Sequence, residues 1–135
     1  MDLYSSDGKK FINVGTGSIW YSIYSTVMVI FSEETRKNLT LALDFLKTGE
    51  CKAENIGSLI AEWKAVQSEM SCISPEKAVY DLRNPEMAPP WKGNIAATVT
   101  SCADLYTTAD GKDLFTEVAS LLEYSFENCT DVLAG

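Results

Sequence analysis

Four acidic residues near the C-terminus come closest to a catalytic or metal-binding set: Asp104, Asp110, Asp113 and Glu117. Paired carboxylates act as acid and base when their surroundings separate their pKa values, and carboxylate oxygens also bind hard cations. The spacing lacks the D-x-D-x-D-G pattern of a calcium loop, and such residues more often cap a helix or face solvent. We therefore expect no catalytic residue, metal or cofactor. The alternative is a small carboxylate-based enzyme or divalent-cation-binding protein.

The chain contains no histidine, which excludes several common kinds of site. A Ser-His-Asp triad, a Cys-His pair, an imidazole base and a His-ligated zinc or iron all need that side chain. The four cysteines are too far apart for a C-x-x-C zinc or redox motif. They are Cys51, Cys72, Cys102 and Cys129. We expect buried free thiols rather than disulfides.

Acidic charge is concentrated in the last third of the chain. The whole sequence has 19 acidic and 11 basic side chains and a net charge of −8. Residues 93–135 hold seven acidic side chains and a single lysine, Lys112, for a net charge of −6. An acidic surface repels nucleic acids and anionic membranes and favours a basic macromolecular partner. We therefore expect no nucleic acid and no membrane as partner.

Hydrophobic periodicity predicts a mainly helical α+β fold with about four to five helices and a small sheet element. Residues 9–15 have the pattern of a short strand that ends at a glycine-containing turn. The apolar run Ile19–Phe31 fits either a helix or a buried strand, and is too short to span a bilayer. Residues 32–49 fit a helix that begins at a serine cap and ends at a glycine. Residues 56–73 carry the clearest apolar helical face.

The loop and helix at the C-terminal side hold the remaining candidate residues. Residues 83–95 contain three of the four prolines and resemble an ordered loop. Trp91 in this loop either covers the domain's own core or anchors a partner, since tryptophan is enriched at binding hot spots. We predict Asp110 as the N-cap of a final helix, with Asp113 as its capping-box-like partner three positions later. No linker or repeat interrupts the chain, so residues 1–135 are expected to form one domain.

Two C-terminal motifs resemble the bacterial immunity protein 70 family, which is found beside polymorphic and contact-dependent toxins. The first motif is the Pro-Pro-Trp stretch within Pro89–Ile95. The second is Leu105–Phe115, in which an Asp-Gly-Lys-Asp-Leu-Phe sequence opens the last helix. The early Gly-Thr-Gly-Ser turn is similar too, so the resemblance extends from about residue 12. Ala109 stands where the family pattern has serine, and residues 131–135 are shorter and less strand-like than that pattern.

The resemblance implies an immunity protein that neutralises the C-terminal domain of a cognate toxin by binding it in the bacterial cytoplasm, without catalysis. The polar start of the chain has no signal-peptide pattern. Such toxins are often basic nucleases, which an acidic surface would cover. We expect the motif residues to be architectural: Pro89, Pro90, Asp110, Gly111, Leu114 and Phe115. The candidate toxin-binding residues are Trp91, Asp104, Tyr106, Asp113, Glu117, Glu123 and Glu127.

Overall fold

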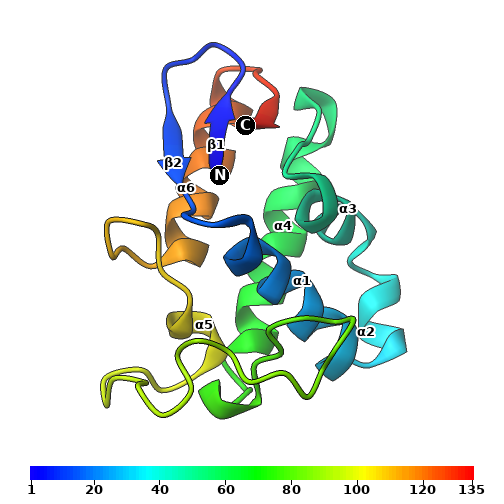
Figure 1. Ribbon diagram of the computed structural model, residues 1–135. Helices are drawn as coiled ribbons and strands as arrows, with labels where there is room; N and C mark the ends of the chain where they lie inside the picture. The colour runs from blue at the N-terminus through cyan, green and yellow to red at the C-terminus, as the bar shows by residue number, and fades with distance from the viewer.

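The computed structural model describes residues 1–135 and places a three-stranded sheet at one end of a set of helices (Figure 1). The elements are β1 (Asp2–Ser5), β2 (Phe11–Asn13), α1 (Gly17–Ile30), α2 (Glu33–Lys37), α3 (Thr40–Thr48), α4 (Ala53–Met70), a 3-10 helix η1 (Pro75–Lys77), α5 (Cys102–Leu105), α6 (Leu114–Glu127) and β3 (Val132–Ala134). The predicted mainly helical α+β class is confirmed. The helices exceed the expected number because α2 and α5 are very short.

Helix α4 is the central helix, and it packs against α6, α3 and α5. Its apolar face is fully buried and consists of Ile56, Leu59, Trp63, Val66 and Met70. The Trp63 ring stacks on Trp20 of α1 at 5.8 Å between centroids and meets Phe45 of α3 edge-on at 5.7 Å. Its Nε1 donates a hydrogen bond to the carbonyl oxygen of Phe115 in α6, at 3.1 Å. This aromatic cluster therefore joins four helices in one core.

The sheet has the order β2-β1-β3, with both pairs antiparallel. Side chains alternate between the two faces of a strand. Leu3 and its partner Ile12 are buried on the helix side, together with Val132. Phe11, Tyr4 and Leu133 form a cross-strand row on the opposite face. Only β2 was expected from the sequence. β1 and β3 are only four and three residues long, too short to produce a clear alternating pattern.

Residues 19–30 are helical within α1, and Phe31 is its C-cap, so the alternative of a buried strand is wrong. None of the helices combines the length and the apolar content needed to cross a membrane.

Residues 32–49 form two helices rather than the single one expected. The predicted Ser32 cap is confirmed, since its hydroxyl accepts a hydrogen bond from the Thr35 amide at 3.1 Å. The chain then breaks between α2 and α3. The carboxylate of Glu62, on α4, accepts a hydrogen bond from the Ala42 amide at 3.1 Å. It thus gives a partner to one of the free amides in the first turn of α3. That acceptor lies 20 residues away, which is why local pattern did not predict the break.

The predicted glycine cap at the end of α3 is confirmed, because Gly49 adopts a left-handed φ of 73°. This glycine also lies against the sheet: a Cβ on it would stand 2.6 Å from the Cβ of Ala134.

We expect Gly49→Ala to lower the free energy of unfolding by more than Gly8→Ala. Both glycines have a left-handed φ, which costs alanine roughly 1–2 kcal/mol. Only at Gly49 does the added methyl also collide with a neighbour, adding about 1–3 kcal/mol. Urea denaturation of both variants measures the difference, and equal losses would contradict the close packing of α3 on the sheet.

Candidate functional site

The turn before α6 places Asp113, not Asp110, at the start of the helix. The Asp113 carboxylate accepts hydrogen bonds from the amide (3.2 Å) and hydroxyl (2.5 Å) of Thr116. Thr107 and Asp113 form an antiparallel bridge that closes a hairpin before the helix can begin. The predicted cap at Asp110 is therefore wrong, and Gly111, with a φ of 84°, allows the hairpin to turn.

Asp110 stabilises the hairpin itself. Its carboxylate accepts a hydrogen bond from the Thr108 hydroxyl at 2.5 Å, which lowers the pKa of Asp110, and it lies 3.6 Å from the Lys112 ammonium. Leu114 and Phe115 follow the hairpin and are fully buried. Asp110 thus contributes to the turn, and Leu114 and Phe115 contribute to the core beneath it.

Asp104 forms a capping box with Ser101 at the start of α5. Its carboxylate accepts hydrogen bonds from the amides of Ser101 (2.9 Å) and Thr100 (3.2 Å). Burial favours a higher pKa for Asp104, but these hydrogen bonds outweigh it and lower the pKa. The hydrogen bonds of Asp104 thus stabilise its charged form, while those of Asp113 all fall on Oδ2.

The three glutamates of α6 differ in their contacts. Glu123 is exposed and pairs with Lys64 of α4 at 3.7 Å, an exposed ion pair that contributes little to stability. Glu127 is exposed and takes part in no salt bridge. Glu117 is half-buried and also has no salt-bridge partner. Two of the three glutamates therefore have no ion-pair partner.

Glu117 lines a cleft of about 480 Å³ between β2 and the first turn of α6. The other lining residues are Phe11, Ile12, Asn13, Thr108, Ala109, Asp110 and Lys112. The Ala109 amide donates to the Asn13 carbonyl oxygen at 2.9 Å, which fixes the hairpin beside the strand. Phe11 is 67% exposed, and sequence reasoning gave it no functional role. The available signal was a phenylalanine on the polar side of a short predicted strand.

Tyr106 is a core residue and is only 2% exposed. Its hydroxyl lies 2.9 Å from the Ser22 hydroxyl and 3.1 Å from the Thr26 hydroxyl of α1, and burial raises the pKa of Tyr106 to about 12. The expectation that Tyr106 anchors a partner is therefore corrected. Its position depends on hydroxyls more than 75 residues earlier in the chain, which sequence spacing does not reveal.

Trp91 packs over the same part of the core. Its ring meets Tyr80 edge-on at 5.8 Å and Tyr106 edge-on at 5.9 Å between centroids. The side chain is half-buried, and its Nε1 has no hydrogen-bond partner. Of the two roles considered for Trp91, the geometry favours the cover over the domain's own core. Pro89 lies beside it along a groove of about 470 Å³, while Pro90 is exposed.

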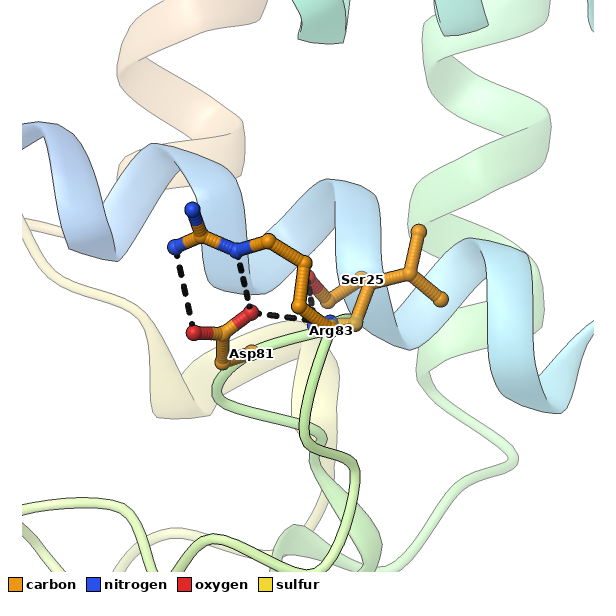
Figure 2. Close-up of polar contacts among 4 residues, drawn as sticks. Ser25, Asp81 and Arg83 are labelled. Atoms are coloured by element: carbon orange, nitrogen blue, oxygen red, sulfur yellow. Dashed lines mark hydrogen bonds and ion pairs between the residues drawn. The ribbon is translucent and has the colours of Figure 1, made fainter.

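Residues 78–100 have no regular secondary structure apart from turns, and hydroxyls of α1 hold their first part in place. The Thr26 hydroxyl accepts from the Val79 amide at 2.9 Å, and the Ser22 hydroxyl donates to the Val79 carbonyl oxygen at 2.7 Å. Figure 2 shows the next contact, in which the Ser25 hydroxyl accepts from the Leu82 amide at 2.9 Å. Ser22, Ser25 and Thr26 were not among the residues expected from the sequence to position a site. The pattern that could have indicated them is a set of hydroxyl side chains at helical spacing inside an apolar run.

A cation–π contact completes the anchor of this segment, and an ion pair within the segment orients its cation. The guanidinium of Arg83 donates two hydrogen bonds to the Asp81 carboxylate, at 3.1 and 3.2 Å (Figure 2). These bonds lower the pKa of Asp81. The same guanidinium lies 5.3 Å from the ring centroid of Tyr21 on α1. The segment that carries Trp91 is therefore held to α1 by both neutral and charged contacts.

No group of three histidine, cysteine, aspartate or glutamate side chains is arranged to hold a metal ion. The carboxylates of Asp104, Asp110 and Asp113 serve three separate turns, so the alternative of a carboxylate enzyme or cation-binding protein gains no support. All four cysteines are free thiols. Only Cys102 is buried, which raises its pKa to about 11. Cys72 and Cys129 are exposed, contrary to the expectation of burial.

Comparison with known proteins gives one match. The model of the family described as Immunity protein 70 matches residues 4–133, almost the whole chain. No curated protein and no solved structure shows significant similarity.

Replacing each of the two hairpin aspartates by alanine, one at a time, distinguishes the residue that caps α6 from the residue that stabilises the turn. We expect Asp113→Ala to lower the free energy of unfolding by about 0.5–2 kcal/mol, because it leaves the first amides of α6 without their acceptor. Asp110→Ala removes only contacts within the hairpin and should have the smaller effect. Urea denaturation distinguishes the two, and a larger loss for Asp110→Ala would contradict the assigned cap.

The hydroxyl network under the irregular segment gives a second prediction. Thr26→Val keeps the side-chain shape but leaves the buried Val79 amide without its acceptor, at a cost of about 1–3 kcal/mol. Thr26→Ser keeps the hydroxyl and should lose clearly less stability. Hydrogen exchange at the Val79 amide should accelerate in the valine variant alone. Unchanged exchange would show that the network does not hold the segment.

Proposed function

Because this chain belongs to the immunity protein 70 family, we propose that it neutralises a cognate toxin domain by binding and covering it, without catalysing a reaction. The family makes the chain an immunity protein of a toxin–immunity system. The type of toxin and the way it is blocked are the proposed part. The observation that carries this part is the two glutamates of α6, Glu117 and Glu127, that take part in no salt bridge.

Apart from Asp110, which contacts Thr108 and Lys112 within the hairpin, the acidic side chains of residues 93–135 divide into two groups. Asp104, Asp113 and Asp131 accept hydrogen bonds from main-chain amides, and the Asp131 carboxylate meets the Ala53 amide at 2.7 Å. At least one oxygen of each of these carboxylates is committed to the fold, so we expect them to act on a partner mainly by long-range electrostatic attraction. Glu117, Glu123 and Glu127 have no such amide contact and are the glutamates of α6 available for direct binding.

A basic partner fits this arrangement best. Opposite charges steer two proteins together and raise the association rate, while like charges disfavour wrong partners. A nuclease binds phosphate with a basic surface, so an acidic helix that takes the place of the nucleic acid would cover its active site. We therefore propose a nuclease-type toxin whose basic face docks on α6, in the cytoplasm of the bacterium that makes both proteins.

The test is binding to the toxin domain encoded beside the gene for this chain. The double variant Glu117→Lys, Glu127→Lys should associate at least about tenfold more slowly at low salt, and its rate should depend less on ionic strength. Stopped-flow kinetics at several salt concentrations measures both effects.

The matched control is Glu33→Lys, Glu34→Lys, which makes the same change of charge on α2, on the opposite side of the molecule in Figure 1. This control should associate nearly as fast as the native protein. If both double variants slow association equally, net charge alone matters and α6 is not the docking surface. No binding of the native protein at micromolar concentration would overturn the proposed function.

A further inference from the structure

We propose that the cleft between β2 and α6 receives a guanidinium group from the partner protein, an inference that rests on the proposed function and adds the chemistry of the contact. Three features converge on this cleft: an open strand edge, an exposed aromatic ring and an uncompensated carboxylate.

The strand edge of β2 is open at Phe11. The Ser5 amide donates to the Lys10 carbonyl oxygen and the Val14 amide to that of Met1, each at 2.9 Å. In an antiparallel ladder this alternation directs the main-chain groups of Phe11 away from β1. The other edge of the sheet is closed, because Val132 and Cys51 exchange two hydrogen bonds of 2.9 Å. On the outer edge of β2, facing away from β1, only the main chain of Asn13 has a partner, the Ala109 amide.

Phe11 is the most exposed large apolar side chain of the molecule. It begins the cross-strand row with Tyr4 and Leu133, a sheet face that no helix covers (Figure 1). Uncovered apolar surface with a polar rim is typical of interaction sites, and aromatic residues are enriched there. The row therefore provides the apolar part of a docking surface that ends at the cleft.

The net negative charge of the cleft favours a cationic group as its ligand. Its lining includes two carboxylates and one lysine, and Lys112 already faces Asp110 at 3.6 Å. Glu117 is left without a counterion in a half-buried position, where attraction to a cation is stronger than on an open surface. The groove beside Trp91 differs, because its two glutamates and two lysines favour neither sign.

A guanidinium suits this cleft better than an ammonium. Its planar fork donates to a carboxylate in two parallel hydrogen bonds, and its remaining donors suit a main-chain carbonyl such as that of Phe11. Its flat face also stacks on an aromatic ring, which a compact, strongly hydrated ammonium does less well. The partner side chain is therefore an arginine from the basic face of the toxin.

The cleft is tested first without the toxin. In NMR titrations of the native protein, N-acetyl-arginine amide should shift the amide signals of Phe11 and Glu117 more than signals elsewhere. N-acetyl-citrulline amide has the same shape without the charge and should not do so. Phe11→Ala and Glu117→Gln should each remove the response, while Phe126→Ala and Glu34→Gln should keep it. Equal shifts with citrulline, or equal losses in the control variants, would overturn the proposal.

The second measurement uses the toxin domain encoded beside the gene. We expect Phe11→Ala and Glu117→Gln to weaken binding at least about tenfold, and Phe126→Ala and Glu34→Gln to change it much less. If the native protein binds the toxin but all four variants bind equally well, the cleft proposal fails and the proposed function stands. If the native protein does not bind the toxin, the proposed function fails, and the arginine titration still decides whether the cleft accepts a guanidinium.

Discussion

The hydrogen bond from the Trp63 indole to the Phe115 carbonyl oxygen is the contact on which the placement of the C-terminal part depends. Both residues are fully buried, so the indole N–H has no water to bond and needs this acceptor. The bond joins the middle of α4 to the first turn of α6, while the Trp63 ring also packs against α1 and α3. This attachment and the hydrogen bond from the Ala109 amide to the Asn13 carbonyl oxygen together position the hairpin and the cleft beside β2.

A second constraint comes from the irregular segment 78–100. Buried main-chain groups must find hydrogen-bond partners, and this segment has no helix or sheet to supply them. Three hydroxyls of α1 do so at Val79 and Leu82, and the Tyr106 hydroxyl joins the same network. Trp91 then packs edge-on between Tyr80 and Tyr106. Within the Pro-Pro-Trp motif it is thus the tryptophan that covers the core at this end, while Pro90 is exposed.

The acidic side chains have two different roles, holding the fold together and presenting charge to a partner, and the net charge alone does not distinguish them. Asp104, Asp113 and Asp131 each accept hydrogen bonds from main-chain amides, and removing one would disturb a turn or a helix end. Glu117 and Glu127 have no ion partner and contribute charge that a basic protein can use. A partner therefore meets fewer usable carboxylates than the sequence suggests, and they lie along one helix that begins beside an open strand edge.

The sequence by itself determined the helical class, the apolar face of α4, the serine cap of α2 and the glycine cap of α3. These features depend on spacing and capping within a few residues, which local pattern encodes. It also led to the family, through two C-terminal motifs. Only the tertiary structure decided the break between α2 and α3, the strands β1 and β3, the burial of Tyr106 and the neighbourhood of Phe11 and Glu117. Each of these depends on a partner far away in the chain, such as Glu62 for Ala42 or Ser22 for Tyr106. Residue spacing carries no information about which distant groups meet, because that is set by how the helices pack.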